Sequence, residues 1–293
     1  MSKVTSTTPG KLMIFGEHAV VYGYPCIVTS INKHITVEVE KTKLESDIFH
    51  TPGVPDTSFV RSALNLFREK YNTEDPVSIT TQSDLGNYGL GSSAAVTVAL
   101  LKALAKLYDI RLSKKELFKL SYETILRVQK TASGFDVAAC VFGGTILFDG
   151  KSKKVTKIIS EKLPLLAVYS GRKASTVSMI DKVKYLKNKK PRFVEDLFKE
   201  IAKIVNQGKL AIQAGDWKVV GKLMNKNHQL LAKLGVTTPE LDNLVMGLSQ
   251  AGAFGSKLSG AGGGDCVIAL VSDDKKKNIE KEIIKKGAEI IDI

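Results

Sequence analysis

Cysteine and tryptophan are scarce in this sequence, whose 293 residues include three cysteines and one tryptophan. The cysteines Cys26, Cys140 and Cys266 lie far apart, which argues against a zinc site and against a dense disulfide framework. Each is surrounded by apolar or small residues, so we expect reduced, buried thiols with a structural role.

Long apolar segments are missing too. No uninterrupted apolar run approaches the roughly 20 residues that span a bilayer. Residues 1–10 are polar and lack the apolar core of a signal peptide. Because 43% of the residues are hydrophobic and charges are interspersed among them, the chain can bury a sizeable core. The sequence therefore predicts a soluble cytoplasmic protein.

Acidic residues are in the minority, since 43 lysines and arginines against 30 aspartates and glutamates give a formal net charge of +13. Such a charge raises nucleic acid as a partner. The lysines, however, are spread along the chain, and no run of aromatic residues alternates with basic ones. We expect a solvated lysine-rich surface that attracts anionic small molecules, with no nucleic-acid or membrane partner.

The residue pattern predicts an α+β protein with mixed sheets. We expect a helix N-cap at Ser113 paired with Glu116, and helix breaks near Gly208 and Gly215. The lysine-rich segment 151–157 suggests two domains, 1–157 and 158–293. Strands are predicted at 12–15, 35–40, 77–80, 143–150, 165–169 and 266–271, and helices at 59–71, 94–108, 114–130, 175–187, 193–234, 240–251 and 274–286.

The segment Gly89-Leu90-Gly91-Ser92-Ser93-Ala94 directly precedes a helix pattern. Glycines adopt the backbone angles that turn N–H groups toward an anion, and the helix adds its unpaired N–H groups. The two serines can cap the helix, bind phosphate or coordinate magnesium. The lysine of the common P-loop pattern is missing. Alone, the segment is either a phosphate-binding loop or a glycine turn with a serine N-cap.

A second glycine-rich run, Gly260-Ala261-Gly262-Gly263-Gly264, separates two predicted strands. With so few side chains, its backbone can approach a ligand closely. A tight hairpin without a ligand is the other interpretation, and two glycine-rich loops in one chain make it less attractive.

Four polar side chains outside the glycine-rich segments are further candidates. Asp136 follows a flexible turn and could take a proton from an attacking hydroxyl, although a helix N-cap explains it equally well. Lys11 precedes an apolar strand and could reach a phosphate or Asp136. Glu17 and His18 follow that strand, where loops commonly build sites.

In this order, the pieces resemble the GHMP kinases over essentially the whole chain. Residues 9–23 resemble the first family motif, 89–95 the second and 257–265 the third. The resemblance implies ATP and Mg²⁺ as cofactors. It also implies an N-terminal domain with a left-handed β-α-β unit and a ferredoxin-like C-terminal domain.

Within the family, residues 16–23 and 227–236 resemble the mevalonate kinases. That resemblance implies phosphorylation of mevalonate, with Asp136 as catalytic base, Lys11 as its electrostatic partner and Ser93 as magnesium ligand. It places Glu17 and His18 near the acceptor, and we add Ser175 and Thr176 as acceptor contacts. A homodimer is left open.

One position departs from that pattern. Mevalonate kinases usually carry a magnesium-binding glutamate eleven residues before the catalytic aspartate, and here that residue is Ile125. Glu123 is two residues away and points to another face of a helix. Residues 133–139 and 262–265 resemble phosphomevalonate kinases at least as well, and Lys33, Arg172 and Lys173 could serve a phosphorylated acceptor. A non-catalytic metabolite-binding relative is the remaining alternative.

Overall fold

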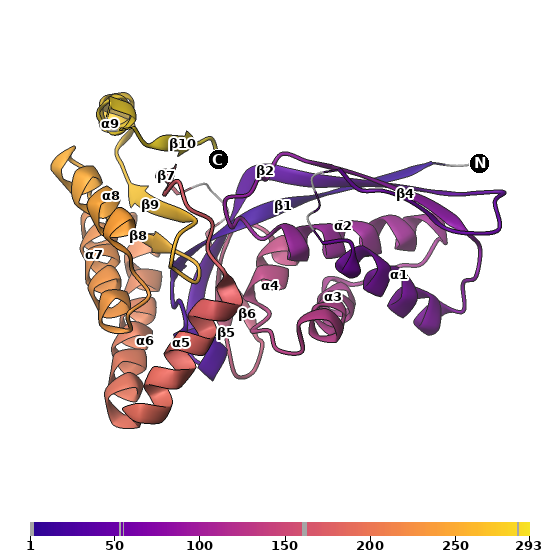
Figure 1. Cartoon of the computed structure of the whole chain (residues 1–293), viewed down its shortest axis with the longest axis horizontal. Coiled ribbons are helices and arrows are strands. Elements are labelled where there is room, and N and C mark those ends of the chain that lie inside the picture. The colour runs from indigo at the N-terminus through magenta and orange to yellow at the C-terminus, as the bar shows by residue number, and fades with distance from the viewer. Residues whose placement is uncertain (1–2, 53, 55, 160–162, 286) are drawn as a thin grey trace. The chain divides into compact units, whose positions relative to one another are not determined.

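A computed structural model describes residues 3–52, 54, 56–159, 163–285 and 287–293. They form two compact units (Figure 1). The first contains Met1–Lys11, Ser30–Gly86 and Leu90–Gly143, and the second contains Leu12–Thr29, Asn87–Gly89 and Gly144–Ile293. The first two strands therefore contribute residues to both units. A domain boundary between residues 157 and 158 stays a prediction.

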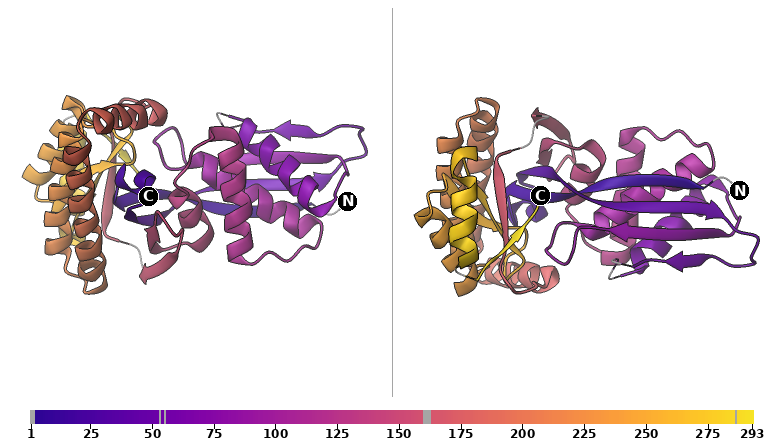
Figure 2. Two further views of the ribbon diagram at one scale, coloured as in Figure 1. Left: turned by 90° about the horizontal axis from the view of Figure 1, so that it is seen from below. Right: turned by 90° about the horizontal axis from the view of Figure 1, so that it is seen from above.

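In the first unit, an antiparallel pairing joins residues 35–41 of β2 to residues 77–83 of β4, and β3 runs parallel to β4. The helices lie on one face of this sheet: Figure 2 shows helices in front from one side and strands in front from the other. Val37 and Val39 alternate with more exposed residues, as a half-buried strand requires. The elements are β1 (Val4–Phe15), β2 (Pro25–Lys41), β3 (Ile48–His50), β4 (Val77–Ser83), α1 (Ser58–Tyr71), α2 (Ser92–Leu107), α3 (Lys114–Gln129) and α4 (Phe135–Phe142).

Helix α2 is the centre of this helical layer, because it packs against α1, α3 and α4. Its residues from Ala94 to Leu101 are all buried, which fits its run of alanine, valine and leucine. Helix α3 begins with the predicted capping box: the Ser113 hydroxyl accepts from the Glu116 N–H, and the Glu116 carboxylate accepts from the Ser113 N–H.

In the second unit, residues 25–29 of β2 pair antiparallel with β5, and β5 pairs with β6. A separate four-stranded antiparallel sheet has the order β10-β7-β9-β8, and α7 and α8 pack on β8. The elements are η1 (Ala19–Tyr22), β5 (Thr145–Asp149), β6 (Val155–Ile159), β7 (Leu165–Tyr169), β8 (Gly255–Ser259), β9 (Cys266–Leu270), β10 (Glu289–Ile291), α5 (Thr176–Lys189), α6 (Pro191–Gln213), α7 (Trp217–Lys233), α8 (Pro239–Gln250) and α9 (Asp273–Lys285).

The α+β prediction is confirmed, and so is the helix break at Gly215. The break at Gly208 is wrong: α6 continues through it. A Cβ at Gly208 would lie 2.6 Å from the Phe15 ring, so this glycine lets a helix approach an aromatic side chain. Lys286, the predicted end of the last helix, lies outside the described residues.

The three cysteines are buried thiols that form no disulfide, as the sequence predicted. Among the described residues, no helix has both the length and the apolar character needed to cross a membrane.

Candidate active site

The predicted phosphate loop leads into α2, and its last glycine is the N-cap. Gly91 has φ 87° and ψ 32°, in the left-handed region, and no side chain caps the helix. Ser92 and Ser93 lie in the first helical turn, so the serine N-cap is not formed. The first N–H groups of α2 are therefore left without a side-chain cap, and they can bind an anion.

Lys11 and Asp136 lie together, as the sequence suggested. Lys11 Nζ is 3.2 Å from Asp136 Oδ1, and the lysine side chain is 6% exposed against 34% for the aspartate. Asp136 is in the first turn of α4, whose N-cap is Gly134, so the N-cap interpretation of Asp136 is wrong. An aspartate in a first turn is stabilised by the positive end of its helix.

The phosphate loop also contacts the strand that carries Lys11. The Lys11 N–H donates to the Leu90 carbonyl at 2.9 Å. A Cβ at Gly91 would lie 2.9 Å from Lys11 Cε and 3.0 Å from Lys11 Cγ. The first unit therefore brings together the loop, a nearly buried ammonium and a partly exposed carboxylate.

Cys140 supports this arrangement through a contact that the sequence did not indicate. Its thiol donates to the Pro9 carbonyl at 3.3 Å, close to Lys11 in the strand. Burial, with a contribution from the Asp136 carboxylate, raises the pKa of Cys140 to about 12, so the thiol stays protonated. The spacing of the two residues could have indicated this role, because Cys140 follows Asp136 by four residues and therefore lies on the same face of the helix.

Ile125 is buried in α3, and Glu123 does not take its place. The Glu123 carboxylate accepts from Arg127 at 3.2 Å, in an exposed pair. In the described part of the chain, no three or more histidine, cysteine, aspartate and glutamate side chains gather to hold a metal. Of the predicted residues in the first unit, Ser93 in the first turn of α2 and Asp136 in the first turn of α4 carry side-chain oxygen donors. That set suits Mg²⁺, which is usually bound through one or two protein ligands plus substrate phosphates.

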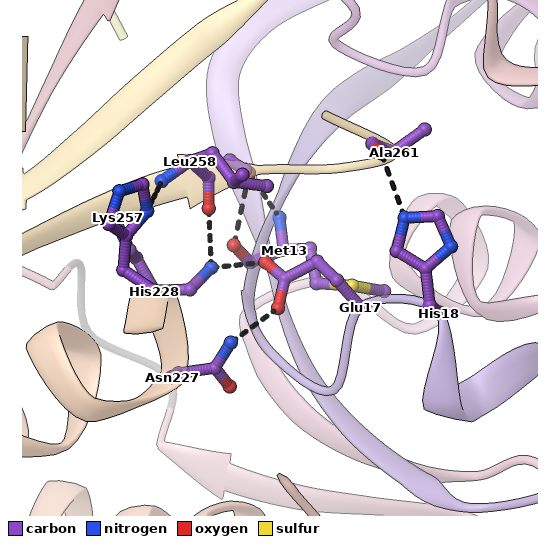
Figure 3. A network of polar contacts seen from close by, with 9 residues as sticks. Met13, Glu17, His18, Asn227, His228, Lys257, Leu258 and Ala261 are labelled. Carbon is purple, nitrogen blue, oxygen red and sulfur yellow. Dashed lines mark hydrogen bonds and ion pairs between the residues drawn. The ribbon is translucent and has the colours of Figure 1, made fainter. Parts of the chain in front are cut away.

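In the second unit, Glu17 and Lys257 form an ion pair whose two side chains have no exposed surface (Figure 3). Lys257 also donates to the Leu258 carbonyl at 2.5 Å, and Asn227 donates to the other oxygen of Glu17 at 3.4 Å. Burial raises the pKa of Glu17 and lowers that of Lys257, while their contact acts in the opposite direction on both. Sequence reasoning did not pair these residues.

His18 lies next to this pair and adopts an unusual backbone conformation, φ 59° and ψ −48°. Its Nε2 is 2.8 Å from the Ala261 carbonyl oxygen (Figure 3). A carbonyl only accepts, so Nε2 carries the proton and donates. Burial lowers the pKa of His18, which keeps the ring neutral and leaves Nδ1 as an acceptor.

The second glycine run is held from two further sides. The Gly263 N–H donates to the Val236 carbonyl at 2.8 Å, and a Cβ at Gly262 would lie 2.2 Å from the same oxygen. Asp265 accepts from the Ala174 N–H at 3.1 Å, and a Cβ at Gly89 would lie 2.6 Å from Asp265 Oδ2. Glycine is therefore required at these positions by close packing.

Of the remaining predicted residues, Ser175 is the N-cap of α5 and accepts from the Ser178 N–H at 3.3 Å. Thr176 is the first residue of α5 and is exposed.

Comparison with known proteins matches this arrangement to one family. The model for the GHMP kinases N terminal domain matches residues 58–144, and that for the GHMP kinases C terminal matches residues 209–289. The mevalonate kinase of Pyrococcus furiosus is 34% identical over 307 residues, covering 94% of this chain and 91% of that protein. The chain belongs to the GHMP kinase family.

Solved GHMP kinase structures agree with this assignment. The crystal structure of Methanococcus jannaschii mevalonate kinase has a TM-score of 0.86 at 31% identity and covers 99% of this chain and 97% of that one. The structure of L. major mevalonate kinase in complex with R-mevalonate has a TM-score of 0.84 at 29% identity and covers 98% and 92%. The two-part GHMP kinase fold is thereby confirmed. The residues matched by the N-terminal family model include both Gly91 and Asp136.

Proposed function

We propose that this protein transfers the γ-phosphoryl group of ATP to the hydroxyl of mevalonate. The Lys11–Asp136 pair against the Leu90–Gly91 loop carries the proposal, because phosphoryl transfer needs phosphate binding, a base and positive charge in one place. The relatives named above support mevalonate as the acceptor, and the phosphomevalonate alternative is not favoured.

Each of the site residues in the first unit has a distinct part in this reaction. The uncapped N–H groups of α2 and the loop backbone bind phosphate oxygens. Asp136, being partly exposed, orients the acceptor hydroxyl and takes its proton. Lys11 holds the Asp136 carboxylate in place and stabilises negative charge that develops on the transferred group. Mg²⁺, when bound with ATP and held by Ser93, would neutralise phosphate charge.

Roles for the second unit stay proposals. The acceptor contacts proposed for His18, Ser175 and Thr176 belong here, as does support of the nucleotide by residues 260–263. The Glu17 side chain has no exposed surface, so an acceptor contact by Glu17 itself is not proposed, and its place near the acceptor is through His18. The neutral His18 ring suits an acceptor contact, because its Nδ1 can accept from a substrate hydroxyl. Cytoplasmic location and a homodimer stay predictions.

A coupled ADP-release assay tests the function. It offers mevalonate and phosphomevalonate side by side, and we expect turnover with mevalonate. Turnover with phosphomevalonate alone would replace the proposed acceptor, and no turnover with either would favour a non-catalytic relative.

The Asp136→Asn variant tests the proposed base. It keeps the size of the side chain and removes its basicity, so we expect turnover to fall by about 100-fold or more. Nucleotide binding, measured by calorimetry, should stay close to that of the parent. Turnover near the parent rate would contradict the role of Asp136.

A further inference from the structure

We propose that the buried Glu17–Lys257 ion pair is a positioning device that locks the turn carrying His18 onto the glycine run 260–264. The functional part of this inference rests on the proposed function, in which both segments belong to the site. Neither charged side chain has exposed surface, so both act through the segments that they join.

Three connections join residues 13–18, at the end of β1 and in the turn after it, to residues 257–261, at the end of β8 and the start of the glycine run (Figure 3). The Ser259 hydroxyl donates to the Met13 carbonyl and accepts from the Met13 N–H, both at 3.0 Å. Glu17 pairs with Lys257, and His18 donates to the Ala261 carbonyl at 2.8 Å. The ion pair is therefore accompanied by a clamp on the Met13 backbone and by the His18 contact.

The presence of two charged residues at this buried place is better explained by the orientation that they fix than by the stability that they add. A buried ion pair contributes little net stability, because desolvation offsets the attraction, and well-packed apolar residues often serve as well. An ion pair with further hydrogen bonds is directional, however. Lys257 is fixed by Glu17 and by the Leu258 carbonyl, and Glu17 is fixed by Lys257 and Asn227.

Two energetically unfavourable features near the ion pair also indicate a positioning role. The His18 backbone is in a sparsely populated conformation that persists only where its surroundings hold it. The Asn227 Oδ1 atom is buried without a hydrogen-bond partner among the described residues, while its Nδ2 faces Glu17. Both residues are held in place by contacts to the ion-pair network or to the glycine run.

The experiment combines Glu17→Leu, Lys257→Met and the double variant. Thermal unfolding and the KM and kcat values for ATP and mevalonate are measured for each. Lys285→Met is the matched control, because it removes an exposed lysine–glutamate pair from α9. Each single variant at the buried pair leaves an uncompensated charge and should lower the Tm, whereas the double variant should regain most of it.

In the double variant, we expect the KM for mevalonate to stay raised about tenfold or more although the Tm is restored, since small displacements in a site are costly. Parent-like KM and kcat values in a double variant with restored Tm would overturn the proposal. So would parent-like kinetics in Lys257→Met combined with loss in Glu17→Leu, which would mean that Glu17 touches the acceptor itself.

A more conservative variant, Glu17→Asp, tests the proposal even if the other variants fail to fold. Glu17→Asp keeps the charge but shortens the side chain by one methylene, so the pair is stretched rather than broken. A raised KM for mevalonate with a nearly unchanged Tm supports positioning, and an unchanged KM argues against it.

Hydrogen exchange separates this inference from the proposed function. Peptides covering residues 16–24 and 258–265 should exchange faster in the double variant than in the parent and in Lys285→Met. This readout needs no turnover, so it stays decisive if the parent does not phosphorylate mevalonate. Unchanged exchange in both peptides would overturn the positioning role.

Discussion

Replacing Gly91 with alanine tests how closely the phosphate loop fits Lys11. Gly91 has φ 87°, a region that costs a residue with a side chain about 1–2 kcal/mol. The added Cβ would lie 2.9 Å from Lys11 Cε, well inside ordinary carbon–carbon contact. The Lys11 side chain is almost completely buried and paired with Asp136, so a shift of Cε away from the added methyl group would move the ammonium relative to the carboxylate.

Gly215 provides the matched control. Its φ is 67°, and a Cβ there would meet no atom within 4 Å. Both alanine variants should therefore lose about 1–2 kcal/mol of unfolding free energy through the backbone alone. Only Gly91→Ala displaces a residue of the proposed site. A displacement of about 1 Å can reduce a rate about 100-fold, so we expect a fall of that order in kcat for Gly91→Ala and about the parent value for Gly215→Ala.

Urea unfolding measures the loss of unfolding free energy, and ADP release under saturating substrates measures kcat. Equal kcat values for the two variants would refute the reasoning, because the loop would then accommodate a methyl group without moving Lys11. A loss of unfolding free energy in Gly215→Ala far above the backbone cost would also count against it, since that position would not be the open turn that the structure shows.

Two further predictions concern the metal and the pH dependence of stability. Ser93→Ala should raise the Mg²⁺ concentration needed for half-maximal turnover by about tenfold or more, and an unchanged metal titration would contradict its role. Burial raises the pKa of Asp47, but the bidentate Arg68 pair and the Val77 N–H outweigh it and leave that pKa below its ordinary value. A lowered folded pKa adds stability above the unfolded pKa, which is lost as pH falls through the folded one. Asp47→Asn should therefore cost about 1–2 kcal/mol of unfolding free energy at neutral pH and less as the pH falls below the unfolded pKa of an aspartate, and a pH-independent difference would refute this.

Local signals explain what could be predicted from the sequence. The capping box of α3 involves Ser113 and Glu116, three residues apart, and period-two alternation marks the buried face of β2. The contact of Lys11 with Asp136 was one of two possibilities that the local sequence left open, and the family resemblance favoured it by bringing distant segments together.

Long-range contacts explain what was missed. Glu17 and Lys257 are 240 residues apart, and nothing in either local sequence indicates that the two charges pair away from water. Gly208 shows the same limit, because glycine in a helix pattern signals a break locally and a close Phe15 contact in the folded chain. Cys140 was judged by its apolar neighbours, which describe its burial but not its bond to Pro9.

The different exposure of Lys11 and Asp136 determines which of them acts as the base. A reacting hydroxyl must reach its base within hydrogen-bond distance, and only Asp136 offers enough surface for that. Lys11 approaches from the protein side, where Gly91 leaves no room beside its alkyl chain. An arginine would need more space and would carry its charge on a wider planar group, so a lysine is the cation that this packing admits. The glycine of the phosphate loop therefore has two consequences: it permits the left-handed turn that frees the helix N–H groups, and it leaves the narrow space in which the lysine ammonium meets the carboxylate.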